Sequence, residues 1–140
     1  MLLMPLPHSC QYALSVSLST HSHHRSGVGA CLGIEDALTL ATVLERAAAK
    51  VSSSDNKLGT EKVVTDAFLA YDAIRRERSQ FGAECAHQTI ETYSWRNPET
   101  GSDTEKIWQD LEKRWDEMWA FDQDAMKENV IRDFEERLRV

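Results

Sequence analysis

The sequence predicts a mainly α-helical fold of three or four helices. Its 140 residues include only six glycines and three prolines, and the long stretches without a helix breaker that follow Gly33 favour helices over a β-rich fold. Apolar residues recur at helical spacing in several of these stretches. This length suffices for one domain with a modest core. We divide the chain into an irregular N-terminal segment, residues 1–26, and a helical part, residues 27–140.

The first helix is expected from about Gly29 to Ala49. Five apolar residues fall at positions i, i+3, i+4, i+7 and i+10, which is one face of a helix: Ile34, Ala37, Leu38, Ala41 and Leu44. Three more widen that face: Leu40, Val43 and Ala47. A helix with so broad an apolar surface is expected to have neighbours on more than one side.

A second helix is expected from about Thr60 to Thr92, after a polar linker over residues 51–59. Its apolar residues lie on one helical side: Val64, Ala67, Phe68, Tyr71, Ile74, Phe81 and Cys85. The first two helices can bury their apolar stripes against each other, antiparallel because the linker is short. Asn97, Pro98 and Gly101 then end any helix between Tyr93 and Gly101.

The C-terminal part predicts one further helix or two. Ser102 and Glu105 have the spacing of a capping box at its start. The third helix carries an apolar series made of Ile107, Leu111, Trp115 and Met118. A break is expected near residues 120–122, after which the last apolar stripe consists of Val130, Ile131, Phe134 and Leu138.

Two glycines that flank one residue, Gly27 and Gly29, open the first helix. Glycine lets a ligand approach the backbone closely, and the free N–H groups of a first helical turn can bind an anionic or electron-rich group. The alternative is a tight turn into a core helix with no ligand, which such a pair of glycines also makes.

The residues that follow resemble a known enzyme family. Residues 27–38, GVGACLGIEDAL, are similar to the helix-opening loop of the FAD-dependent aromatic hydroxylases, the salicylate-hydroxylase-like flavoprotein monooxygenases. Residues 67–78, AFLAYDAIRRER, resemble the tyrosine–aspartate and arginine-rich helix of the same family. Residues 93–96, YSWR, and the Trp/Asp-rich tail resemble the C-terminal end of its fungal members. The resemblance covers about Gly27 to Val140.

The resemblance implies an FAD-dependent monooxygenase that uses NAD(P)H and O₂ to hydroxylate an aromatic, phenolic substrate. It implies that backbone N–H groups near Gly27, Val28, Gly29 and Ala30 face the N1–C2=O edge of the flavin, where fixed donors and the helix dipole stabilise the negative charge of the reduced ring. The sequence offers no residue suited to act as a substrate base, so no catalytic residue is assigned.

Several parts of the family pattern are missing. No Gly-x-Gly-x-x-Gly loop follows a strand, the Gly-Asp-Ala-Ala-His element is absent, and His24 stands where the family has a proline. The chain therefore looks like the C-terminal helical part of a monooxygenase, without the Rossmann-type FAD domain and the substrate-binding sheet. It is expected to be inactive on its own.

Two groups of residues in the helical part allow more than one interpretation. Arg75, Arg76 and Arg78 either contact the FAD-side domain or a carboxylate, or they form a solvated face or internal ion pairs with Asp72 and Glu77. Surface charge clusters favour the second interpretation. The four tryptophans could stack on a flat ligand, but at helical spacing they are more typical of core or interface packing. They are Trp95, Trp108, Trp115 and Trp119.

The remaining features exclude several kinds of site. His21, His23 and His24, with Cys31, lack the further ligands of a structured metal site. Cys85 and His87 lie two apart on a predicted helix and so point to different faces.

Composition and terminal sequence limit the partners and the compartment. A net charge of −7 excludes nucleic acid as the main partner, and no apolar run has the length of a membrane span. Three cysteines without a CxxC pair favour a reducing cytoplasm. The apolar residues 1–4 lack the basic leader of a secretory signal, and residues 1–26 are expected to be disordered or weakly extended.

A second function, from a different class, also fits the sequence. The chain could be a small helical protein-interaction module without catalytic activity, whose acidic, tryptophan-bearing surface binds a partner. An exposed apolar strip on such a module predicts self-association.

Overall fold

The computed structural model describes residues 28–53 and 58–139. Within them it has four α-helices: α2 (Val28–Ser52), α3 (Thr60–Tyr93), α4 (Thr104–Trp119) and α5 (Gln123–Arg137). The mainly helical fold is therefore confirmed, and the helix bounds differ from the expected ones by a few residues. The expectations for residues 1–26 and for Gly27 lie outside the described residues.

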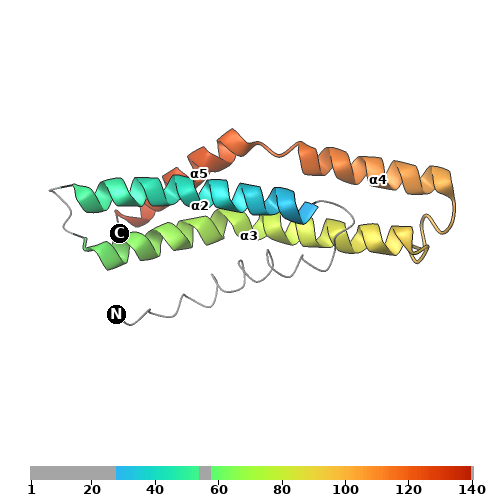
Figure 1. The fold of residues 1–140 in the computed structure, drawn as a ribbon, viewed down its shortest axis with the longest axis horizontal. Helices are drawn as coiled ribbons and strands as arrows, with labels where there is room; N and C mark the ends of the chain where they lie inside the picture. Colours follow the sequence, from blue (N-terminus) through green and yellow to red (C-terminus); the bar gives the residue numbers. More distant parts are fainter. Residues whose placement is uncertain (1–27, 54–57, 140) are drawn as a thin grey trace.

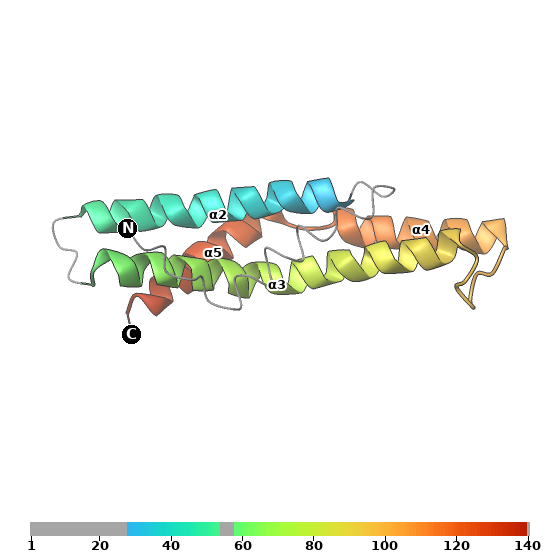
Figure 2. The ribbon, with the colours of Figure 1, turned by 60° about the horizontal axis from the view of Figure 1, so that its bottom comes forward.

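The helices form an elongated bundle (Figures 1 and 2). α2 and α3 lie side by side and antiparallel, as the short linker predicts. α5 packs against both of them, whereas α4 packs against the C-terminal half of α3, which extends beyond the first turn of α2 (Figure 1). The break before α5 falls at residues 120–122, where the sequence predicts it.

The main core lies between α2, α3 and α5. Its buried residues are Val43, Ala47, Val63, Ala67, Ala70, Tyr71, Val130 and Phe134. Burying a Val or Phe side chain contributes about 1.5–3 kcal/mol, so this three-helix junction supplies much of the stability. Part of the last apolar stripe, Val130 and Phe134, is fully buried here, as expected.

The expected inner faces of the first two helices are partly wrong. On α3 the structure buries Val63 and leaves Val64 37% exposed. On α2, Val43 and Ala47 turn inward, while Ile34 is 70% exposed. Helical periodicity shows which residues share a face, but the neighbours that cover that face are distant in sequence.

The helix ends follow local rules. Asp103, rather than the expected Ser102, caps α4: its carboxylate accepts hydrogen bonds from the N–H groups of Glu105 and Lys106. At the end of α3, Trp95 adopts a left-handed conformation with φ 58°. The N–H of Arg96 donates to the carbonyl of Glu91, as in a Schellman motif. Glycine is the usual residue at that position, so the bulky Trp95 is strained there.

Two helical glycines are expected to respond oppositely to alanine. A Cβ at Gly33 would meet nothing within 4 Å, so Gly33→Ala should stabilise the chain by about 1 kcal/mol through helix propensity. A Cβ at Gly82 would lie 2.3 Å from Cδ1 of Leu32, a buried side chain. Overpacking costs about 1–3 kcal/mol, so Gly82→Ala should destabilise it. Urea denaturation measures both, and a stabilised Gly82→Ala variant would show that Leu32 can move aside.

Candidate functional site

Four charged side chains from two helices meet inside the bundle, and we call them the charged cluster: Glu35 and Asp36 of α2, and Arg75 and Arg78 of α3. Arg78 holds Glu35 with two hydrogen bonds, Nε to Oε2 at 3.1 Å and Nη2 to Oε1 at 3.0 Å. Arg75 donates from Nη1 to Oε2 of Glu35 at 2.9 Å and from Nε to Oδ1 of Asp36 at 2.6 Å. Two carboxylates thus neutralise two guanidinium groups.

The charged cluster also reaches the other helices. Arg75 is fully buried, and its Nη2 donates to the carbonyl of Leu32 at 3.4 Å. Nη2 of Arg78 donates to the carbonyl of Met118 at the end of α4, at 2.9 Å. The guanidinium carbon of Arg78 lies 4.1 Å from the ring centre of Phe121, which precedes α5. The cluster therefore fixes the first turns of α2 to α3 and to the α4–α5 corner.

Of the three arginines expected to pair with Asp72 or Glu77, one does so. Arg76 pairs with Asp72 on its own helix. Arg75 and Arg78 instead pair with Glu35 and Asp36, about 40 positions earlier in the chain. Glu35 and Asp36 lie in one segment that resembles the monooxygenase family, and Arg75 and Arg78 lie in another. That both segments belong to one family pattern was the sequence signal that could have indicated a contact between them.

The electrostatic state of Glu35 follows from competing effects. Burial by itself would raise the pKa of Glu35, but the hydrogen bonds from Arg78 and Arg75, together with their positive charges, outweigh it and lower this pKa below its ordinary value. Glu35 is therefore ionised at neutral pH, and the charged cluster is a salt-bridged network rather than a proton donor.

This lowered pKa predicts a pH dependence of stability. A carboxyl whose pKa is lower in the folded state contributes stability above its unfolded-state pKa, and loses it as the pH falls through the folded-state pKa. The urea midpoint of the wild-type chain should therefore fall on acidification from neutral pH to about pH 3. Glu35→Gln should be less stable at neutral pH and show a smaller fall; an equal fall in both proteins would contradict the prediction.

The first turn of α2 holds three of the four residues expected to contact flavin. Val28, Gly29 and Ala30 are helical, while Gly27 lies outside the described residues. The first N–H groups of a helix have no acceptor inside it, and the helix dipole makes this end positive. Gly29 is half-buried and Ala30 is exposed. Glu35 lies seven residues after Val28, about 10 Å along the helix axis, so the charged cluster holds this end of α2 in place.

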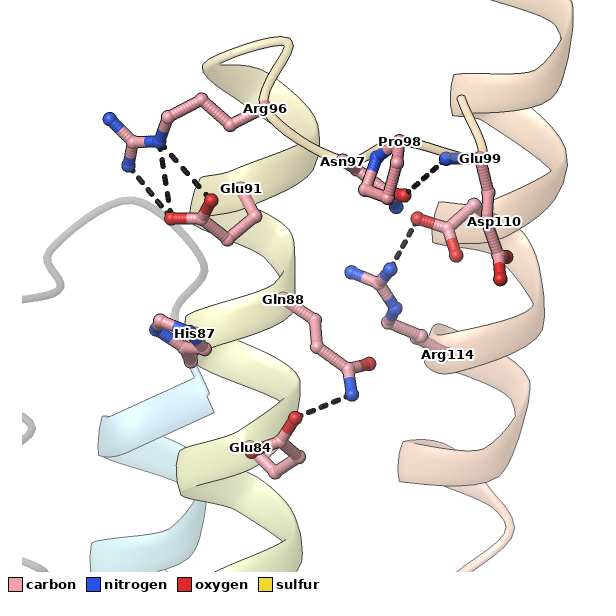
Figure 3. Close-up of a pocket in the computed structure, with 10 residues that line it drawn as sticks. All are labelled: Glu84, His87, Gln88, Glu91, Arg96, Asn97, Pro98, Glu99, Asp110 and Arg114. Atoms are coloured by element: carbon pink, nitrogen blue, oxygen red, sulfur yellow. Dashed lines mark hydrogen bonds and ion pairs between the residues drawn. The ribbon is translucent and has the colours of Figure 1, made fainter. Parts of the chain in front are cut away.

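A polar hollow of about 410 Å³ lies between α3, the loop after it and α4 (Figure 3). Most of its ionic groups pair with one another: Arg96 donates to Glu91 at 2.8 Å, and Arg114 pairs with Asp110. The hydrogen bond from Arg96 lowers the pKa of Glu91. Glu84 and Glu99 line the hollow as well, so its surface carries more negative than positive charge.

Other expectations concern single residues. Cys85 is buried and His87 is exposed, so the two do point to different sides of α3, as expected. Burial raises the pKa of the Cys85 thiol, which disfavours the reactive thiolate. Within residues 28–53 and 58–139, no three His, Cys, Asp or Glu side chains gather as metal ligands; His21, His23 and His24 lie outside these ranges. No helix in the described part of the chain is long and apolar enough to cross a membrane.

The tryptophans do not form a core. All four are exposed, with Trp119 at 70% and Trp115 at 43%. Trp108 and Trp115 contact each other edge to face along α4, with ring centres 6.4 Å apart. The core interpretation is therefore wrong for these residues, and interface packing stays a prediction.

Comparison with known proteins places this arrangement in a family, although no family model and no solved structure matches the chain. It is 38% identical over 117 residues to FAD-dependent monooxygenase orf3 of Aspergillus niger, covering 83% of this chain and 26% of that protein. It is 32% identical over 136 residues to an FAD-dependent monooxygenase of Aspergillus terreus, covering 94% and 29%. Salicylate hydroxylase asL1 of Sarocladium schorii is 30% identical over 122 residues, covering 82% and 25%.

Each of these matches covers more than four fifths of the chain, so each includes residues 27–38 and 67–78, two of the segments that carry the sequence resemblance. The chain spans about a quarter of the length of these curated relatives. The chain therefore belongs to the family of FAD-dependent monooxygenases and corresponds to a segment of such a protein.

Proposed function

We propose that this chain is the flavin-contacting helical part of an FAD-dependent monooxygenase that hydroxylates an aromatic, salicylate-like substrate with NAD(P)H in the cytoplasm. The observation that carries the proposal is the fixed N-terminal end of α2. Its first turn supplies main-chain N–H donors at Val28, Gly29 and Ala30, and the charged cluster locks the next two turns to α3. When bound, FAD would supply the electron transfer and oxygen activation.

The residues at this end of α2 fit a flavin ring on steric and electrostatic grounds. Gly29 and Ala30 are small, and a Cβ at Gly33 would find open space. Main-chain donors at the positive end of a helix suit the N1–C2=O edge, which becomes negative when the ring is reduced. Gly27 is proposed as a further contact of the same kind. The chain itself offers no base for the substrate, so we expect it to be inactive alone.

Titration with FAD tests this proposal. Proline is tolerated at the first position of a helix and removes one N–H group there. Val28→Pro should therefore weaken FAD binding while the helical circular dichroism is kept. Thr60→Pro is the matched control, because it makes the same change at the first residue of α3. Absence of saturable FAD binding by the folded wild-type chain, or equal binding by Val28→Pro, would refute the flavin contact.

A second candidate function, a non-catalytic helical interaction module, is favoured by one observation. Trp95, Trp108 and Trp119 are each more than half exposed, and exposed aromatic side chains are enriched where proteins bind each other. A folded, monomeric protein that leaves FAD unbound would support this function over the first.

A further inference from the structure

One side of α2 is apolar yet uncovered. Ala30, Ile34, Ala37 and Ala41 lie on one helical face and are all exposed, Ile34 to 70%. We call these four residues the outer face of α2. The only charged residues between positions 28 and 44 are Glu35 and Asp36, and both are buried in the charged cluster. Over more than four turns, the solvent-exposed surface of α2 therefore carries no charged side chain.

The neighbouring helix α3 shows what a solvated face looks like in this protein. Its exposed side chains include Arg76, Glu77, Gln80 and Glu84. A surface helix usually carries polar residues on its outer side, whereas a helix that is apolar all round is buried. α2 thus has the composition of a helix with neighbours on both sides, and the described residues cover one side.

Gly33, at the edge of the outer face, supports the same conclusion independently. Glycine inside a helix is less favourable than alanine, so its presence calls for a reason. Gly82 has one within this chain, because a Cβ there would clash with Leu32. A Cβ at Gly33 would meet nothing in the described chain. Close approach of a partner or ligand to the backbone is one reason for such a glycine.

The relatives indicate what covers this face. The matched segment makes up 26% of the A. niger monooxygenase and 22% of FAD-dependent monooxygenase SAT7 of Stachybotrys chartarum, so most of such a protein lies outside it. The outer face begins at Ala30, in the turn proposed to contact flavin, so the polypeptide that holds FAD has to lie beside it. A second copy of this chain is the other candidate, and the oligomeric state of the purified chain tests it.

We propose that the outer face of α2, with Gly33 at its edge, docks the flavin-binding remainder of a family monooxygenase, the polypeptide outside the matched segment. This inference rests on the proposed function, because it names the partner of the same flavin site. Ile34, the largest side chain of the outer face and 70% exposed in this chain, makes the main apolar contact, and Gly33 leaves room for the partner to come close.

The experiment co-expresses this chain with the A. niger monooxygenase lacking its matched 117 residues, tagged for purification. Co-expression allows the two chains to fold together. The wild-type chain should be retained with bound flavin. Ile34→Lys should reduce the retained amount by about tenfold or more, because it buries an unpaired charge. Gln80→Lys, which adds the same charge on the solvated side of α3, should leave it unchanged.

Gly33→Ala gives the sharper discrimination. It should raise the Tm of the chain alone, and yet it should weaken retention by the partner. Equal retention of wild-type, Ile34→Lys and Gly33→Ala chains, or no retention of the wild-type chain, would overturn the docking proposal. A homodimer of this chain that Ile34→Lys dissociates would also overturn it, in favour of a second copy. A complex that Ile34→Lys abolishes but that contains no flavin would keep the docking face and refute the proposed flavin contact instead.

Discussion

Replacing Arg75 by methionine should cost about 3–5 kcal/mol of unfolding free energy, because removing one partner of a buried ion pair leaves its counterpart without compensation. Arg75 is fully buried and holds both Glu35 and Asp36. Domains are typically stable by about 5–15 kcal/mol, so this single change brings the chain close to unfolding. Urea denaturation followed by circular dichroism measures the loss.

Arg46→Met is the matched control for that prediction. Arg46 pairs with Glu135, but its side chain is 48% exposed, and exposed pairs contribute about 0–1 kcal/mol. Arg75→Lys adds a second comparison: it keeps the charge but loses the planar fork, so an intermediate loss is expected. If Arg75→Met were no more damaging than Arg46→Met, the charged cluster would not be a net source of stability.

Phe134→Ala should cost about 3–5 kcal/mol as well, through loss of burial and the cavity left behind. Phe134 has no exposed surface and lies where α5 meets α2 and α3. The same method measures this loss. Trp119→Ala removes a larger aromatic side chain that is 70% exposed, and surface substitutions usually change stability by about 0.5 kcal/mol or less. Similar losses for the two variants would contradict the assignment of the core to the α2–α3–α5 junction.

These two side chains differ in how far the sequence reveals their role. Phe134 belongs to an apolar stripe at helical spacing, so the spacing alone predicts a core residue. Arg75 stands among other charged residues in a helix, and that pattern favours a solvated face or pairing within the helix. Its actual partners, Glu35 and Asp36, lie about 40 residues away, and local spacing carries no information about contacts over that distance.

Features that depend on near neighbours in the chain can be predicted from the sequence. These are the helical class, the break before α5, the antiparallel pairing that a short linker imposes, and the resemblance to the FAD-dependent monooxygenases. Helix formation and termination involve hydrogen bonds and side chains a few residues apart, and so the pattern of residues predicts them.

Which faces are covered and which charges meet depends instead on tertiary packing. Packing turns Val43 inward and leaves Ile34 in water, although both lie on the broad apolar surface of one helix. It joins Glu35 to Arg78 and leaves Trp119 exposed. The physical reason is that burial depends on the neighbours available to a face, and those neighbours are brought together by contacts between helices rather than by the spacing of residues within one.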